Sequence, residues 1–208
     1  MSKQFWIVIA IIIAVFGAVA YKNKSGNSAS DVKVVGATNH VEGNLKSSVK
    51  LVEYGDFQCP YCEAYYPTVK TVVETYKDRI EFQFRNFPLV NNHPNAFAAA
   101  RAAEAAGLQG KYWEMHDALY DSSDWSSWTV ASDPTSFFES YATGLGLNLA
   151  QFRKDYASSA VNDLVNNDMK AGDQLGINGT PSFYLNGKAV QVPNTVDSFN
   201  KVLNAALK

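Results

Sequence analysis

The segment Cys59-Pro60-Tyr61-Cys62 decides how this chain is interpreted, because it holds the only two cysteines among 208 residues. An apolar run precedes it, and residues 63–78 follow with a helical pattern. A C-x-x-C pair between a strand and the start of a helix is typical of reversible dithiol–disulfide chemistry. The unpaired N–H groups and partial positive charge of a helix start stabilise a thiolate there. We therefore predict that Cys59 is the nucleophile and that Cys62 is the less accessible, resolving thiol.

Two other interpretations of the cysteine pair are weaker. A structural disulfide between them would close a very short loop and would restrict the unfolded chain little. A zinc site needs about four ligands. The remaining candidates, His40, His93 and His116, stand at spacings unlike those of zinc fingers. We predict neither a metal nor another cofactor, and we expect His93 to be structural and His116 to be packed or at the surface.

Residues 5–21 form an unbroken apolar run flanked by the short segment 1–4. As a helix, the run would reach roughly 25 Å, near the lower limit for a bilayer core of about 30 Å. The alternative is a secretory signal peptide, since the small-x-small stretch at 18–20 fits a cleavage site. We predict an uncleaved membrane anchor. Under either interpretation the rest of the chain is exported, which suits a dithiol oxidant because the extracytoplasmic side is oxidising.

A polar segment separates this run from the remainder of the chain. Residues 22–30 are small and polar and predict a flexible tether, so that 22–47 form a tether and N-terminal extension. The residues beyond it suffice for one domain with a sizeable core. The chain has 18 basic and 20 acidic residues, giving a formal net charge of −2, with no basic stripe. We therefore expect no nucleic-acid partner.

Two strands flank the helix that follows the cysteines. Residues 49–54 are largely apolar, and residues 79–85 alternate between apolar and polar side chains, with Glu81 and Gln83 on the polar face. Together with the helix at 63–78 they predict a parallel, right-handed β-α-β unit. Pro67 lies inside that helix and is expected to kink it.

The pattern from 95 to 176 is helical. The predicted helices are 96–106, 111–120, 134–143, 149–157 and 161–175. Between the second and third of them, 121–133 is predicted to be a loop that Trp125 and Trp128 pack against the protein.

The C-terminal part predicts a hairpin and a last helix. The strand-like runs 182–185 and 188–192 are separated by Asn-Gly at 186–187, a strong hairpin signal. Thr195 or Asn194 is expected to cap a helix whose apolar residues recur at helical spacing.

These motifs resemble those of DsbA-type thiol–disulfide oxidoreductases of the thioredoxin superfamily, in particular the membrane-anchored branch. The matching segments are Cys59-Pro60-Tyr61-Cys62, Pro67, Phe87-Pro88-Leu89, His93, 109–117 and Gly179-Thr180-Pro181. The resemblance implies an α/β, thioredoxin-like fold, β-α-β then β-β-α, with its halves at 48–92 and 177–208. A helical domain would be inserted at 93–176.

The resemblance also implies roles for individual residues. Pro181 would be a cis-proline that faces the cysteines; without the resemblance, a simple turn proline is the alternative. Glu53 would lie beneath the pair and accept a proton from Cys62 through water, the alternative being a solvated glutamate at the sheet edge. The residues expected to contact substrate are Pro60, Tyr61 and Thr180.

The function expected from this resemblance is an oxidase that introduces disulfides into exported proteins with free thiols. A membrane redox partner would reoxidise the pair, and the N-terminal extension is too short for a dimerisation domain, so a monomer is expected. Tyr61 stands where the best-known oxidants have histidine, which predicts a weaker oxidant. The alternatives are a disulfide reductase or isomerase that uses the same pair, and a non-redox binding protein or chaperone.

Overall fold

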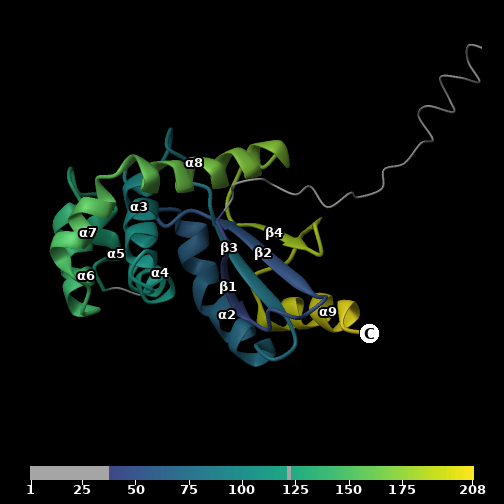
Figure 1. Ribbon diagram of the computed structural model, residues 1–208. Coiled ribbons are helices and arrows are strands. Elements are labelled where there is room, and N and C mark those ends of the chain that lie inside the picture. The colour runs from purple at the N-terminus through teal and green to yellow at the C-terminus, as the bar shows by residue number, and fades with distance from the viewer. Residues whose placement is uncertain (1–37, 121–122) are drawn as a thin grey trace, which may run out of the picture. The chain divides into compact units, whose positions relative to one another are not determined.

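The computed structural model describes residues 38–120 and 123–208, which form a five-stranded sheet of order β1-β3-β2-β4-β5 (Figure 1). The strands are β1 His40–Gly43, β2 Lys50–Gly55, β3 Glu81–Asn86, β4 Ser182–Leu185 and β5 Lys188–Val190. β2 and β3 are parallel, and the other neighbouring pairs are antiparallel. The predicted order, β-α-β followed by β-β-α, is confirmed.

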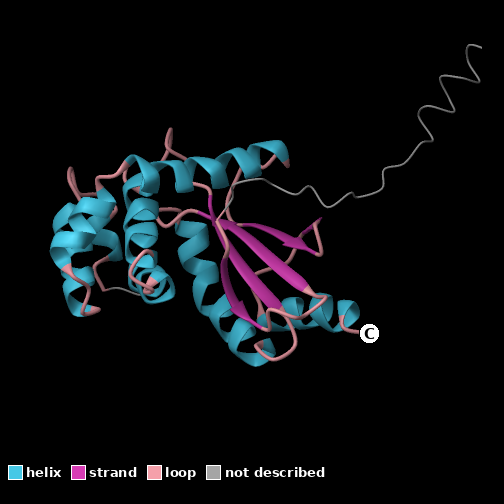
Figure 2. Cartoon of the chain, in the orientation of Figure 1, coloured by secondary structure: helices cyan, strands magenta, loops and turns pink. Residues whose placement is uncertain are grey.

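The helices surround this sheet and also form a separate group beside it (Figure 2). They are α2 Pro60–Tyr76, α3 Ala96–Gly107, α4 Tyr112–Tyr120, α5 Trp125–Trp128, α6 Thr135–Gly144, α7 Leu149–Tyr156, α8 Ser159–Gln174 and α9 Val196–Ala206. Because α3 to α8 lie between β3 and β4 in the chain, the predicted helical insertion is confirmed.

One face of the sheet packs on α2 and α9. Leu51 is paired in register with Phe82, so both side chains leave the sheet on the same face. They form one core cluster with Val72 of α2 and Phe199 and Leu203 of α9. This cluster holds the helix that begins at the cysteine pair against the centre of the sheet.

The opposite face of the sheet packs on α8. Tyr54 of β2 clusters there with Phe87 and with Ala171 of α8. Gly172, the next residue along α8, has no room for a side chain, since an added Cβ would lie 2.5 Å from the Phe87 ring. The close approach of α8 therefore depends on small residues.

A buried polar cluster ties the inserted helices to the sheet. Asp168 on α8 accepts hydrogen bonds from the backbone N–H and the hydroxyl of Thr38, both at 2.7 Å, and from the N–H of Asn86 at 3.0 Å. Glu104 on α3 accepts one from Asn86 Nδ2 at 2.6 Å and lies 2.9 Å from His40 Nε2. Buried carboxylates are costly without such partners. These contacts therefore hold α3 and α8 to β1 and β3.

Two features of the sheet differ from the sequence prediction. β3 was expected to have one polar face, yet the side chains of Glu81 and Gln83 on that face are both buried. Gln83 Nε2 and Lys50 Nζ pair with the Glu81 carboxylate. In addition, residues 40–43 within the predicted N-terminal extension form β1, which pairs antiparallel with β3.

The helices also differ in detail from the prediction. α2 begins at Pro60, three residues before the predicted start, and continues through Pro67. The predicted loop 121–133 contains the short helix α5. Trp128 is fully buried and packs edge-on against Phe138, so it does fasten this segment.

The predicted hairpin and final helix are confirmed. Asn186 and Gly187 between β4 and β5 have φ values of 50° and 76°. Asparagine and glycine are the residues that adopt such positive values most readily in two-residue hairpin turns. The Thr195 side chain caps α9 by accepting a hydrogen bond from the Ser198 N–H.

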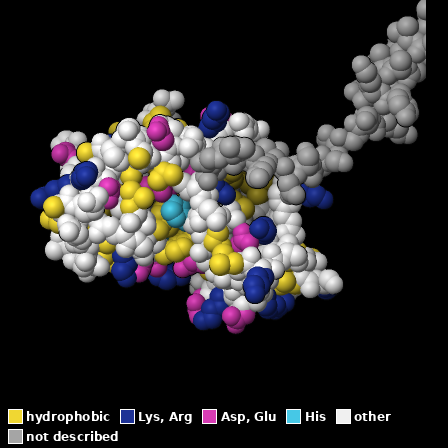
Figure 3. Space-filling view, viewed as in Figure 1, with side chains coloured by type: hydrophobic (Ala, Val, Ile, Leu, Met, Phe, Trp, Pro, Cys, Tyr) yellow, Lys and Arg dark blue, Asp and Glu magenta, His cyan; other side chains and the backbone are white. Residues whose placement is uncertain are grey.

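Within residues 38–120 and 123–208, no helix is long and apolar enough to cross a bilayer. The predicted anchor or signal segment at 5–21, its flank at 1–4 and the tether at 22–30 lie outside the described residues. On the face of the molecule drawn in Figure 3, basic and acidic side chains are interspersed.

Candidate redox site

The cysteine pair lies where β2 passes into α2. Cys59 is the N-cap of α2, Pro60 takes its first position, and Cys62 follows within the first turn. Proline suits that first position because its missing N–H has no partner there in any helix. Both cysteines are free thiols and both are buried, with 3% of Cys59 and 1% of Cys62 exposed. Cys59 is the more exposed of the two, as predicted, but only narrowly.

Hydrogen bonds around Cys59 favour its thiolate. The largest effect comes from the Cys62 thiol, and together with smaller contributions it lowers the pKa of Cys59 to about 5, although burial opposes the shift. The smaller contributions come from the Thr180 side chain and from the backbone N–H groups of Cys62 and Tyr61. The Cys59 thiol donates to the Thr180 carbonyl at 3.4 Å. The Thr180 hydroxyl is buried without a partner among the described residues, so it is available to the thiolate.

The pKa of Cys62 is shifted in the opposite direction. Burial, followed by the hydrogen bond with Cys59 and the nearby Glu53 carboxyl, raises its pKa well above the ordinary value. The Asp56 N–H lies 3.5 Å from its sulfur. At neutral pH the pair therefore consists of a thiolate on Cys59 and a protonated Cys62, the division of roles predicted from the order of the cysteines.

Glu53 lies beneath the pair on β2. Its side chain is buried, with 5% exposed, so the alternative of a solvated glutamate at the sheet edge is wrong. Burial, with a smaller effect of Cys59, raises its pKa to about 8. A carboxyl with this pKa carries its proton at pH 7 and gives it up within one pH unit. Such a group suits proton exchange with a neighbouring thiol.

The segment before β4 completes the site. The Thr180–Pro181 peptide bond is cis, as predicted. A groove of about 280 Å³ lies beside it and is lined by Tyr61, Tyr65 and Pro181, among others. Tyr61 is 71% exposed, so its ring is free to meet another molecule at the mouth of the site.

Asp56 is a site residue that the sequence analysis missed. Its carboxylate is buried and accepts hydrogen bonds from the N–H groups of Gln58 and Leu89, both at 2.8 Å, and it lies 2.6 Å from His93 Nδ1. Its own carbonyl accepts from the Cys59 N–H at 3.0 Å. Asp56 therefore fixes the loop that carries both cysteines. His93 therefore has a structural role, as predicted, because its ring contacts this carboxylate.

The inserted helices also hold the cysteine loop. Gln58 Nε2 donates to the Thr129 carbonyl at 2.6 Å, and Gln58 Oε1 accepts from the Asn95 N–H at 2.6 Å. Trp125 Nε1 donates to the Phe57 carbonyl at 2.9 Å. Residues 57 and 58 precede Cys59 directly, so the insertion buttresses the redox loop. No sequence signal marks these contacts, because their partners are backbone groups far away in the chain.

His116 is buried on α4, as the packed alternative predicted. It makes edge-on contacts with Phe57, Phe84 and Tyr120, and its Nδ1 lies 3.1 Å from Asp117. Burial lowers its pKa, although Asp117 acts in the other direction. No group of side chains suited to a metal ion is found within the described part of the chain.

Known proteins match both the sequence and this arrangement. A family model described as thioredoxin matches residues 36–205. The chain belongs to the thioredoxin family. It is 28% identical over 211 residues to the probable disulfide bond formation protein D of Bacillus anthracis, which covers 98% of this chain and 94% of that protein. The structure of a thioredoxin-like oxidoreductase from Silicibacter pomeroyi DSS-3 superposes with a TM-score of 0.67 and 27% identity, over 81% of this chain and 91% of the other.

These matches confirm the predicted resemblance to DsbA-type thiol–disulfide oxidoreductases within the thioredoxin family. Other relatives are much longer. The chain is 37% identical over 169 residues to the Na(+)/H(+) antiporter NhaA 1 of Mycolicibacterium gilvum (strain PYR-GCK), which is 80% of this chain but 26% of the antiporter. The chain thus spans about a quarter of the length of that relative. The similarity concerns this portion of the antiporter alone.

Proposed function

We propose that this protein is a thiol–disulfide oxidoreductase that introduces disulfides into exported proteins on the outer side of a membrane, to which residues 5–21 anchor it. The observation that carries the proposal is the contrast between the two thiols. The pKa of Cys59 is lowered to about 5, whereas that of Cys62 is raised well above the ordinary value. A stabilised thiolate favours the reduced pair, and this makes the corresponding disulfide an oxidant.

In the proposed reaction, a substrate thiolate attacks the sulfur of Cys59 in the oxidised pair. The Cys59–Cys62 bond breaks, a mixed disulfide forms on Cys59, and Cys62 leaves as a thiolate that takes a proton from Glu53 through water. A second substrate thiolate then attacks the substrate sulfur of the mixed disulfide, and Cys59 leaves as a thiolate. The substrate loses two electrons to the pair, which a membrane redox partner reoxidises.

The neighbouring groups suit these steps. Tyr61 and Pro181 line the groove beside the pair, where we place the extended substrate, with Pro60 and Thr180 in contact with it. Glu53 is protonated at neutral pH, because burial raises its pKa to about 8. It is therefore a proton source for the leaving thiolate of Cys62 and a proton acceptor in the reverse direction.

The test is oxidation of a reduced, unfolded secretory protein by the purified oxidised chain. We expect stoichiometric disulfide formation by the wild type and none by Cys59→Ser or Cys62→Ser, because neither variant can hold the Cys59–Cys62 disulfide. When Cys62→Ser is instead mixed with a substrate that contains a disulfide, its Cys59 thiolate should attack that disulfide and accumulate as a mixed disulfide. Activity that survives the loss of both cysteines would favour a non-redox binding protein. Reduction of substrate disulfides without net oxidation would favour the reductase.

The location has its own test. A membrane-impermeant thiol reagent added to intact cells should label reduced Cys59. Labelling that appears only after lysis would overturn both the proposed location and the oxidase role.

A further inference from the structure

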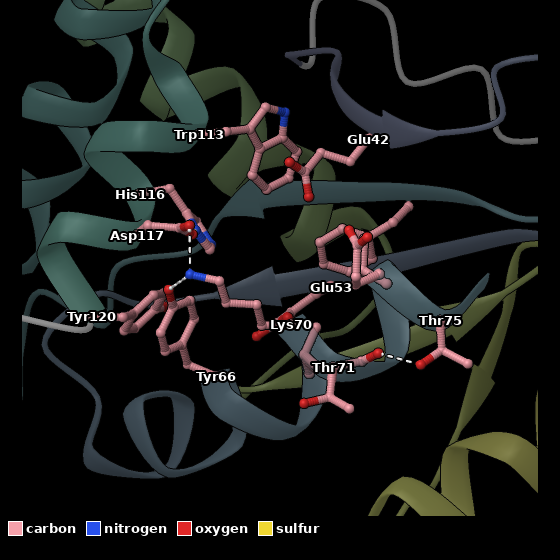
Figure 4. Close-up of a pocket in the computed structure, with 14 residues that line it drawn as sticks. Glu42, Glu53, Tyr66, Lys70, Thr71, Thr75, Trp113, His116, Asp117 and Tyr120 are labelled. Carbon is pink, nitrogen blue, oxygen red and sulfur yellow. Dashed lines mark hydrogen bonds and ion pairs between the residues drawn. The ribbon is translucent and has the colours of Figure 1, made fainter. Parts of the chain in front are cut away.

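A pocket of about 580 Å³ lies on the sheet between α2 and α4 (Figure 4). Its floor is formed by β1, β3 and β2, α2 contributes Val69 and Val73, and α4 contributes Trp113. It shares no lining residue with the groove beside the Thr180–Pro181 bond. Its volume lies within the range of about 300–1,000 Å³ that is usual for small-molecule sites.

Two carboxyl groups enter this pocket from the same face of the sheet. Glu42 of β1 pairs in register with Phe82 of β3, and Glu53 of β2 pairs with Phe84, two residues further along. Side chains at such positions leave the sheet on one face. Strand spacings place the Glu42 and Glu53 Cα atoms about 12 Å apart, so their carboxyl groups flank a gap of molecular size above Phe82.

Two residues that line this pocket carry polar groups without partners within the described structure. Glu53 is buried, and none of the described residues donates a hydrogen bond to its carboxyl group. The Tyr120 hydroxyl, also in the lining, is buried without a partner among the described residues. Buried polar atoms are rarely left unpaired in folded proteins. An unpaired carboxyl and an unpaired hydroxyl on residues that line one cavity therefore point to a ligand that satisfies them.

The charges of the lining determine the chemistry of that ligand. The ammonium of Lys70 is already bound by Asp117 at 2.9 Å and by the Tyr66 hydroxyl at 2.8 Å (Figure 4). Burial keeps His116 neutral by lowering its pKa. Glu42 has no ion-pair partner among the described residues, and partial desolvation of its carboxyl, with Asp117 nearby, raises its pKa. At neutral pH the pocket therefore holds Glu42 without an ion-pair partner and, in Glu53, a protonated carboxyl whose ionised form a bound cation would favour.

The walls are apolar and aromatic. Phe82 and Trp113 contact one another with ring centroids 5.8 Å apart, and Val69 and Val73 lie on the facing helix. Aromatic faces attract cations as well as apolar groups. A ligand that carries both a positive charge and an apolar body would satisfy the floor and the walls together.

We propose that this pocket binds a small protonated amine with an apolar body, its ammonium between Glu42 and Glu53 and its apolar part against Trp113 and Phe82. The site is separate from the proposed substrate groove and does not rest on the proposed redox function. Occupancy would place a positive charge beside Glu53, the residue proposed to exchange protons with Cys62. Ligand binding would therefore couple to the redox pair.

The test is calorimetric titration of the full-length protein with 2-phenylethylamine and with its uncharged counterpart 2-phenylethanol. We expect the alcohol to bind at least tenfold more weakly than the amine. Glu42→Gln should weaken binding of the amine at least fivefold. Asp163→Asn, which removes an exposed carboxylate on α8 outside the pocket, should leave binding within twofold of wild type.

Equal affinity for the amine and the alcohol would overturn the proposal, and so would an unchanged affinity in Glu42→Gln. Glu42 is exposed on the edge strand β1, so this variant should fold normally. If it does not fold, the comparison of amine with alcohol on the wild type still decides. Disulfide transfer measured on the same samples separates a failure of this site from a failure of the proposed redox function.

Discussion

The Cys62 thiol is the largest cause of the low pKa of Cys59, so replacing Cys62 with alanine should raise that pKa. A hydrogen bond to a charged group contributes about 1.5–3 kcal/mol. One pH unit corresponds to about 1.4 kcal/mol. The loss of the thiol should therefore move the pKa of Cys59 from about 5 to about 6–7.

The assay is the rate of alkylation of Cys59 by iodoacetamide between pH 3 and pH 9, together with thiolate absorbance at 240 nm. The variant has a single cysteine, so both signals report Cys59 alone. Cys62→Ser is the matched control: its hydroxyl keeps a donor at the same place, and its shift should be less than half as large.

A pKa that stays near 5 in Cys62→Ala would refute this reasoning. In that case the N–H groups of the first turn of α2, rather than the neighbouring thiol, would stabilise the thiolate.

Three further changes have defined outcomes. Because the pKa of Glu53 is about 8 when folded against an ordinary 4.5, the stability that its protonated form contributes below pH 4.5 is lost as pH rises through 8. The free energy of unfolding of reduced Glu53→Gln, measured in urea relative to that of the wild type, should therefore rise by up to about 5 kcal/mol from pH 4 to pH 9. Asp56→Asn should cost about 1–3 kcal/mol, since it weakens the hydrogen bonds that the buried carboxylate makes with the N–H groups of Gln58 and Leu89 and with His93. Gly55→Ala should cost about 1–3 kcal/mol in thermal unfolding, because its Cβ would lie 2.4 Å from the Phe84 ring.

Each of these expectations can fail. If the difference in the free energy of unfolding between Glu53→Gln and wild type does not change with pH, Glu53 titrates normally. Unchanged stability of Asp56→Asn would mean that the loop before the cysteines is held by other contacts. A Gly55→Ala protein as stable as wild type would show that Phe84 moves aside at no cost.

The parts of the fold that were predicted from the sequence carry local signals. An alanine-rich stretch predicted α3, Asn186-Gly187 predicted the hairpin turn, and the capping residue Thr195 predicted the start of α9. β1 has only four residues and a single apolar side chain, Val41, so alternation was too short to detect it. Glu81 was assigned to a polar face because alternation along one strand does not reveal burial, and its partner Lys50 lies on a different strand.

The residues of the candidate site also fall into two groups, those with a local sequence signal and those without one. Cys59 and Cys62 stand out by composition alone, whereas Glu53 and Pro181 were found only through the resemblance to a known family. Asp56 was missed, although it lies three residues before the first cysteine, because an aspartate in a loop is ordinary in a sequence. Its importance depends on His93 and the Leu89 N–H, which the fold brings to it.

The measurement that tests the central claim most directly is the reduction potential of the Cys59–Cys62 pair, obtained by equilibration with glutathione. The stabilised thiolate of Cys59 predicts a potential between about −230 mV, the lower limit of glutaredoxins, and about −120 mV, the value of a strong oxidant. A value near −270 mV, that of thioredoxin, would contradict the oxidase assignment and leave a reductase in its place.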